Sequence, residues 1–360
     1  MTQSLLLVVL SCFGQEIKID TIELFKNEAG RPKCSPLEET IACHSRKCKR
    51  YYDISLLNTD GTEKICLTCD HPDLPNKHIG QPSWHPNGKW IIFQAEMKDH
   101  VLPNVGLLAV PGIGFHNDIY IMNIETKAVY QLTNLKTKIY IGDKTPTSAI
   151  LQPFFNNNGT QVSWSERIDD GDDWGKWVIK IADIVFDSDK PKLINIKEYF
   201  PGINSGYYES NEFLPGDSVL CICGNLEKNQ KEIGIDIYLL NLKTNKTVRL
   251  TNSLNYFDEC PHPNHSGTKI CYLSTDGFPN SDSKQWWKWA KGEFWIMNTD
   301  GTCKQQITHF NTKGYNEYTG MRTIPEYISW SPDDKTIFLG IAVEYKKGKL
   351  KDQIWKIKLS

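Results

Sequence analysis

Short apolar runs of strand length recur along the chain, and one of them repeats four times almost unchanged. Each copy begins with an acidic residue, continues through mostly apolar positions and ends in Asn. The copies are Asp53-Ile-Ser-Leu-Leu-Asn58, Asp118-Ile-Tyr-Ile-Met-Asn123, Asp236-Ile-Tyr-Leu-Leu-Asn241 and Glu293-Phe-Trp-Ile-Met-Asn298. A second short strand follows each copy and closes in Leu-Thr or Ile-Thr, always 15 residues after the acid. A fixed internal period of this kind predicts a fold built from repeated units.

Two weaker copies, 176–181 and 352–357, extend the series, and a hairpin precedes every copy. The hairpins turn through Pro, Asn, Asp or Gly, which suit tight turns because Asn and Gly tolerate positive φ. The hairpins begin at Cys34, Trp84, Phe155, Phe213, Pro263 and Trp330. Each unit therefore contains four short antiparallel strands. Six such units predict an all-β fold, a six-bladed β-propeller in which each blade packs against its neighbours.

The last unit ends at Ser360, before its fourth strand. Residues 16–25 alternate like a strand and have no other partner, so we expect them to form the outer strand of the last blade. The chain then comprises a leader at 1–14 and a single propeller over 15–360. The expected blades cover about 31–68, 81–133, 152–195, 210–251, 259–308 and 326–360.

Three segments carry a resemblance to a known family: Trp330-Ser-Pro-Asp-Asp-Lys335, Asp236–Asn241 and Asn298-Thr-Asp-Gly-Thr302. They resemble the WD40-like PD40 repeats of TolB-type propellers. The resemblance covers roughly 16–360; it departs from the pattern at 176–196 and in the first blade, at Ser35-Pro-Leu-Glu-Glu39. It implies an extracytoplasmic six-bladed propeller used for protein contacts, sometimes joined to a peptidase domain. No G-x-S-x-G elbow of such a peptidase appears in this sequence.

The first residues have two interpretations. Leu5–Leu10 is an apolar run followed by Ser11 and Cys12, which suits a short export signal because a membrane span needs about 20 apolar residues. Cys12 would then be the lipidated first residue of a periplasmic or extracellular lipoprotein, and the lipid would be the protein's membrane anchor. The residues before the apolar run lack the usual positive charge. A cytoplasmic protein whose first residues form a buried strand is the alternative.

Composition narrows the function classes. The formal net charge is −2, which gives no global electrostatic attraction to nucleic acid or to an anionic membrane. The 11 cysteines are too few for a disulfide scaffold of this length, and their number is odd. Cys66 and Cys69 form a C-x-x-C without a second pair at zinc-finger spacing. Because Cys221, Cys223 and Cys271 lie among apolar residues, we interpret them as small core side chains.

Long irregular segments are expected on one face of the propeller. In antiparallel blades, the connections between second and third strands and between blades emerge together, and here these are the long ones. They are 94–117, 134–150, 196–208, 274–292 and 309–325. Long loops on a rigid scaffold are where binding usually occurs, so this loop-bearing face is the predicted functional face.

Aligning the six hairpins places one set of residues at the mouth of the channel on that face: Gly30, Gly80, Leu151, Glu209, Glu259 and Glu326. Three successive blades thus present a carboxylate, with Asp258 and His262 beside the middle one and Arg31 one position further along the first blade. Confined carboxylates repel one another, so we expect a cation, a Lys- or Arg-bearing partner or Arg31 among them. The alternative is that each Glu only caps backbone amides or pairs with a neighbouring blade.

Aromatic and histidine motifs give two further candidates. Trp286, Trp287 and Trp289 lie in a predicted loop, where they could stack on sugar rings or anchor a partner, or instead be buried against the blade. His262 and His265 are three residues apart across a turn, a spacing unlike that of a helical metal site, and a turn role is the alternative.

Two functions fit these features. The first is a non-catalytic, monomeric scaffold, without a cofactor, that binds a protein or peptide partner on its loop-bearing face. The second is a cation-dependent carbohydrate-active propeller, a polysaccharide lyase or a sugar-binding protein. In it the carboxylates and His262 would hold Ca²⁺ or another divalent cation and the tryptophans would stack on sugars. We expect the first, because the sequence lacks the clustered histidines that would favour a metal-dependent lyase.

Overall fold

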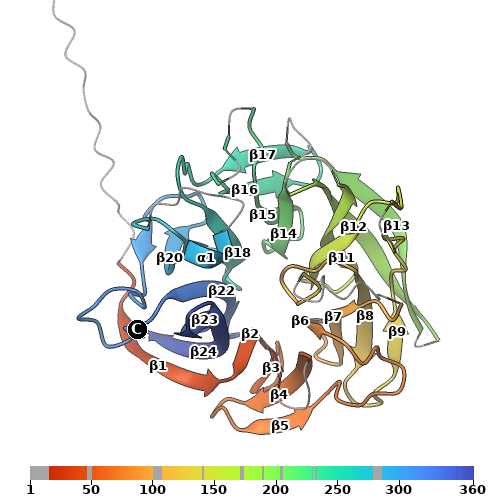
Figure 1. The fold of residues 1–360 in the computed structure, drawn as a ribbon, viewed down its shortest axis with the longest axis horizontal. Helices are drawn as coiled ribbons and strands as arrows, with labels where there is room; N and C mark the ends of the chain where they lie inside the picture. Colours follow the sequence, from red (N-terminus) through yellow and green to blue (C-terminus); the bar gives the residue numbers. More distant parts are fainter. Residues whose placement is uncertain are drawn as a thin grey trace, which may run out of the picture.

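The computed structural model describes residues 16–46, 51–99, 108–139, 142–170, 174–188, 190–202, 206–228, 230–231, 233–278 and 286–360. Its strands form six four-stranded antiparallel sheets, which Figure 1 shows arranged around a central axis. The predicted six-bladed β-propeller is confirmed. Cys12 and the rest of the predicted leader lie outside the described residues.

The strands of each blade follow one another from the axis outward. The first blade contains β2 (Ala29–Cys34), β3 (Thr40–Ser45), β4 (Asp53–Asn58) and β5 (Glu63–Cys66). The second contains β6 (Ile79–Trp84), β7 (Trp90–Glu96), β8 (Asn117–Asn123) and β9 (Val129–Gln131). The third contains β10 (Ala149–Phe155), β11 (Gln161–Asp169), β12 (Lys176–Asp187) and β13 (Lys190–Tyr199).

The remaining blades keep the same order. The fourth contains β14 (Tyr208–Phe213), β15 (Val219–Gly224), β16 (Asp236–Asn241) and β17 (Lys246–Arg249). The fifth contains β18 (Asp258–Pro263), β19 (Lys269–Ser274), β20 (Glu293–Asn298) and β21 (Gln305–Gln306), with the short helix α1 (Trp286–Trp289) between β19 and β20. The sixth contains β22 (Thr323–Trp330), β23 (Thr336–Lys346), β24 (Lys349–Leu359) and β1 (Ile19–Asn27).

The two ends of the described chain meet in the last blade. β1 pairs antiparallel with β24, and Ile22 lies opposite Ile357. In Figure 1 the red β1 lies along the outer edge of the blue sheet. The predicted closure by an N-terminal strand is therefore confirmed. It removes the exposed edge that β24 would otherwise present.

The 15-residue repeat is a hydrogen-bonded latch between the third strand of a blade and the segment after its fourth strand. The Thr hydroxyl donates to the carboxylate of the acid and accepts a hydrogen bond from the N–H that follows the acid. The donor and acceptor pairs are Thr68 with Asp53 (3.0 Å), Thr133 with Asp118 (2.7 Å), Thr251 with Asp236 (3.0 Å) and Thr308 with Glu293 (2.7 Å). Because the acids are buried, the latch satisfies charges that would otherwise be costly to desolvate.

The apolar core lies between the blades. Each of the six junctions between neighbouring blades has its own buried cluster, including the junction of the sixth blade with the first, where Phe338 and Ile354 pack with Ile41. Cys221, Cys223 and Cys271 are fully buried in these clusters or their strands, as predicted for small core side chains. The ring is thus held by side-chain packing across each junction.

The long connections emerge on the predicted face, between second and third strands and between blades. Some boundaries differ from the expectation: strand β13 continues from Ile196 to Tyr199 because its backbone pairs with β12, and β22 already begins at Thr323. No helix in the described part of the chain is long and apolar enough to cross a membrane.

Candidate functional site at the channel mouth

A recurring X-Pro dipeptide shapes the inner strands. Arg31, Gln81, Gln152 and Cys260 each precede a proline and have φ values of +48°, +54°, +49° and +53°. At each of these positions the pairing between the first and second strands shifts register, as expected where a proline cannot donate to the ladder. Such a bulge redirects the side chain before the proline. Gln152, for example, reaches Glu209 on the next blade and Cys260 on the blade after it.

Arg31, Glu209, Glu259 and Glu326 interact electrostatically at the mouth of the channel. Arg31 comes from β2, and the three glutamates come from β14, β18 and β22 of successive blades. Burial opposes the charge of Arg31, but Glu326, together with smaller contributions from Cys260, Tyr327 and Glu209, outweighs that effect and holds its pKa above the usual value. The guanidinium lies 5.7 Å from the centre of the Tyr327 ring. The structure therefore brings together the carboxylates and the arginine that the sequence singled out.

Glu209 is the inner, fully paired member of this group. It is 4% exposed, and its carboxylate accepts hydrogen bonds from the Tyr207 hydroxyl (3.0 Å), the Cys223 thiol (3.4 Å) and the amide of Gln152. Burial raises the pKa of Glu209, and these donors oppose the rise. This pairing matches the alternative interpretation, in which each glutamate only pairs with groups of the blades around it.

Glu259 and Glu326 differ from Glu209 because they are half-buried and, within the described residues, no donor contacts their carboxylates. Burial and the charges of Glu209 and Asp258 together raise the pKa of Glu259 to about 8, against the opposing effect of Arg31. Burial also raises the pKa of Glu326 to about 7, with a contribution from Asp352. These two carboxylates remain accessible to a ligand.

Asp352, which sequence reasoning did not place at the site, belongs to it. Asp352 opens the last copy of the repeated segment, but the fourth strand of its blade is β1, from the other end of the chain. Instead of a Thr latch, its Oδ2 accepts a hydrogen bond from the Tyr52 hydroxyl at 2.8 Å and lies 3.9 Å from Nε2 of His44. Burial and the charge of Arg31 lower the pKa of His44 well below its usual value, so this imidazole is neutral.

Part of the mouth is covered. In the connection between β7 and β8, Gly112 lies against the guanidinium of Arg31, and Pro111 lies against Gly80. A Cβ at either glycine would overlap these neighbours. The connection therefore lies over the first and second blades, while Glu259 and Glu326 lie on the fifth and sixth.

His262 lies three residues further along β18 than Glu259. It is 0% exposed, and its Nδ1 is 3.2 Å from Oε1 of Glu212, which also pairs with Lys33. Its ring packs edge-on against Phe154 and Tyr327. Burial lowers the pKa of His262 well below its usual value. The sequence analysis singled out neither Lys33 nor Glu212.

The remaining predicted site residues are Asp258, the three tryptophans and His265. Asp258 is buried and accepts a hydrogen bond from the Ser253 hydroxyl at 2.7 Å; burial raises its pKa to about 6. Trp289 packs against Ala290, Ile324 and Ala342 between the fifth and sixth blades. The side chains of Trp286 and Trp287 lie outside the described set. His265 is part of a turn in which its N–H donates to Asp334.

Comparisons with known proteins bear on the architecture. No protein-family model and no curated protein matches the chain. Among solved structures, TolB from Acinetobacter baumannii is similar, with a TM-score of 0.50 and 14% identity, over 92% of this chain and 64% of TolB. This chain therefore spans less than two thirds of the length of that TolB.

Two oligogalacturonate lyases are also similar. One, in complex with manganese, has a TM-score of 0.52 and 11% identity, over 94% of this chain and 96% of the lyase. The other, from Vibrio parahaemolyticus, has a TM-score of 0.53 and 10% identity, over 95% of this chain and 96% of the lyase. At such identities the likeness shows the fold, a TolB-like six-bladed propeller, which supports the resemblance found in the sequence.

Proposed function

We propose that the chain is a non-catalytic scaffold that binds a polypeptide partner on its loop-bearing face and takes a lysine or arginine side chain of that partner at the channel mouth. The observation that carries this proposal is the pair Glu259 and Glu326, two accessible carboxylates that no donor in the described residues satisfies. A cationic side chain supplies both the charge and the hydrogen bonds that they lack.

The charge balance of the mouth favours a cation. Glu209, Glu259, Glu326 and Asp352 are opposed by Arg31 and by Arg46, which lies 4.2 Å from the centre of the Tyr52 ring. Because the pKa values of Glu259 and Glu326 are raised, these two carboxylates are partly protonated near neutral pH. An incoming ammonium or guanidinium group replaces those protons, so binding is expected to strengthen as the pH rises.

The face around the mouth also presents apolar contact area. The connection between β21 and β22 exposes Tyr315, Tyr318 and Met321, which are 48%, 38% and 44% exposed. Aromatic residues and methionine are enriched in protein interfaces. They support a polypeptide, rather than a lone cation, as the ligand.

Binding of an oligolysine peptide, measured by isothermal titration calorimetry, tests the proposal. We expect the double variant Glu259→Gln/Glu326→Gln to bind at least tenfold more weakly than wild type, and wild-type binding to tighten between about pH 6 and about pH 9. Glu23→Gln removes one charge from the exposed outer strand β1 and is the control for non-specific attraction. Equal weakening in the control and in the double variant, or binding that is independent of pH, contradicts the proposal.

A carbohydrate-active propeller is the second candidate, supported by the full-length similarity to the oligogalacturonate lyases, one of which is in complex with manganese. Within the described residues, however, the carboxylates of the mouth do not form a group of three potential metal ligands. A cation there would have to draw Glu259 and Glu326 together. Incubation with oligogalacturonate and Mn²⁺, followed by the ultraviolet absorbance of an unsaturated product, distinguishes this function from partner binding.

We also propose that the protein acts outside the cytoplasm as a monomer, anchored through a lipid on Cys12. The apolar run before Cys12 supports this location. Metabolic labelling with palmitate is expected to mark the wild type and not Cys12→Ala. Label that persists in the variant, or that is missing from both, contradicts the anchor.

A further inference from the structure

The latch of the first blade differs from those of the second and fourth blades in one respect. In the second and fourth blades the residue two positions before the latch Thr donates to the second oxygen of the acid. Gln131 donates to Oδ2 of Asp118 at 3.2 Å, and Arg249 donates to Oδ2 of Asp236. In the first blade the corresponding residue is Cys66, and Cys69 follows the latch Thr directly.

These two cysteines lie beside the acid of their own latch. They form a disulfide, with their Cα atoms 5.7 Å apart. One carboxylate oxygen of Asp53 and the two Sγ atoms all lie within 4.8 Å of one another. Within the described residues, one group of three His, Cys, Asp or Glu side chains has its ligand atoms this close together, and it is this one. The latch thus places an oxygen and two sulfur atoms together where other blades place an amide or a guanidinium.

We propose that Asp53, Cys66 and Cys69 form a zinc site when the disulfide is reduced. Two thiolates separated by two residues are a common zinc ligand pair, and a carboxylate oxygen is an accepted third ligand. Reduction adds two electrons and two protons to the disulfide and gives two thiols. A trialkylphosphine can supply the electrons and water the protons, and the water oxygen then leaves on the phosphine oxide. Binding of Zn²⁺ then releases the two thiol protons.

The carboxylate can hold the metal without giving up its latch. Oδ1 of Asp53 accepts the Thr68 hydroxyl at 3.0 Å. Asp236 shows that the same position uses both oxygens at once, since its Oδ1 accepts from Thr251 and its Oδ2 from Arg249. In the first blade the metal takes the place of the guanidinium.

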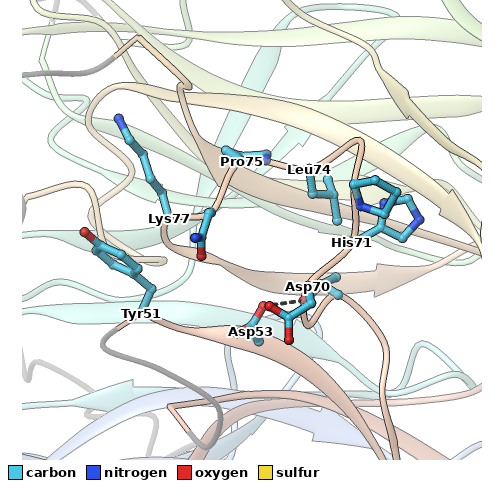
Figure 2. A pocket seen from close by; sticks show the side chains of 10 residues that line it. Tyr51, Asp53, Asp70, His71, Leu74, Pro75 and Lys77 are labelled. Atoms are coloured by element: carbon cyan, nitrogen blue, oxygen red, sulfur yellow. Dashed lines mark hydrogen bonds between the residues drawn. The ribbon is translucent and has the colours of Figure 1, made fainter.

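A pocket of about 250 Å³ adjoins the site on the loop-bearing face. Asp53 and Thr68 form part of its wall, and Figure 2 shows Tyr51, Asp70, His71 and Lys77 around it. Three protein ligands leave one tetrahedral position of the metal, and water from this pocket is expected to fill it. His71 keeps its own contact, since its Nε2 is 2.9 Å from the carbonyl oxygen of Lys127.

Zinc binding by the full chain tests this proposal directly. The protein is reduced with a trialkylphosphine, desalted without oxygen and titrated with Zn²⁺ against a chromophoric chelator. We expect the reduced wild type to take one more equivalent of Zn²⁺ than the oxidised wild type. Cys66→Ser and Cys69→Ser, which keep the size of the side chain, are expected to lose that equivalent. Circular dichroism checks that each variant is folded.

A matched pair of latch variants isolates the carboxylate. Asp53→Asn is expected to weaken Zn²⁺ at least tenfold, whereas Asp118→Asn, which alters the same latch in the second blade where no thiol is present, leaves the affinity unchanged. Cd²⁺ in place of Zn²⁺ is expected to give the ultraviolet band of thiolate coordination in wild type and not in the cysteine variants. The proposal is wrong if reduction adds no equivalent, or if Cys66→Ser retains it.

Discussion

The Tyr52 hydroxyl donates a hydrogen bond to Oδ2 of Asp352 at 2.8 Å, although the two residues are 300 positions apart in the sequence. The bond joins the start of the first blade's third strand to the third strand of the last blade. Asp352 occupies the position of the latch acid in its blade. The Thr that pairs with this acid in four other blades has no counterpart there, which leaves Asp352 for Tyr52. Tyr52 therefore replaces the latch at the junction where the two ends of the chain meet.

Tyr52→Phe is expected to destabilise the protein by about 1–3 kcal/mol, because it leaves the partly buried carboxylate of Asp352 without its donor. The ring remains, so its stacking on His44, with centroids 4.4 Å apart, is retained. Urea denaturation measures the loss. Tyr120→Phe is the control, since Tyr120 is also buried and, within the described residues, its hydroxyl donates to no carboxylate. Equal losses in both variants would mean that the bond to Asp352 contributes nothing specific.

The latch itself makes a second prediction. Thr251→Val keeps the shape of the side chain but removes the hydroxyl that donates to Asp236 and accepts the N–H of Ile237. A loss of about 2–3 kcal/mol in the free energy of unfolding is expected, because a buried charge and a buried N–H each lose a partner. Thr244→Val, in an exposed turn of the same blade, is the control. A loss of less than about 0.5 kcal/mol in Thr251→Val contradicts the latch.

Local patterns in the sequence predicted the fold because each blade repeats the same short-range chemistry. The constant distance from acid to Thr reflects a hydrogen bond within one blade, so it is visible without any knowledge of the other blades. The closure by residues 16–25 followed from the missing fourth strand of the last unit. The glutamates of the mouth were found in the same way, since equivalent positions of successive units converge at one ring.

The rest of the site depends on contacts between blades, which no local pattern contains. Tyr52 and Asp352 meet only after the ring closes. The orientation of Arg31 depends on its bulge, and the recurrence of X-Pro at one place in four units was the available signal. Glu209 has hydrogen-bond donors and Glu259 has none among the described residues. The donors of Glu209 include Tyr207 and Gln152, and no pattern in the sequence indicates that they contact it.

The raised pKa values of Glu259 and Glu326 predict how stability depends on pH. Their folded-state pKa values of about 8 and about 7 exceed the ordinary value of 4.5, so between these limits the folded protein binds more protons than the unfolded chain. The free energy of unfolding is therefore expected to fall as the pH rises from about 5 to about 8. The slope is at most about 1.4 kcal/mol per pH unit for each proton.

Urea denaturation across this pH range tests the prediction. Glu259→Gln/Glu326→Gln cannot release these protons, so its stability should fall less steeply and exceed that of wild type at about pH 8. Glu23→Gln, on the exposed outer strand, should keep the wild-type slope. A double variant whose pH profile parallels that of wild type shows that these carboxylates are not the groups that titrate.

Gly112→Ala tests whether the connection between β7 and β8 is held against Arg31. Gly112 and Gly142 both have a φ of +94°, so alanine strains the backbone equally at both positions. A Cβ at Gly112 overlaps the guanidinium of Arg31, whereas nothing lies within 4 Å of a Cβ at Gly142. We expect Gly112→Ala to cost about 1–3 kcal/mol more than Gly142→Ala in urea denaturation, because the clash displaces the segment or the guanidinium. In an Arg31→Ala background this excess should vanish, since the overlapping atoms are gone. If the excess cost persists in the Arg31→Ala background, another neighbour of Gly112 causes it. If Gly112→Ala and Gly142→Ala cost the same, the connection does not pack on Arg31 in solution.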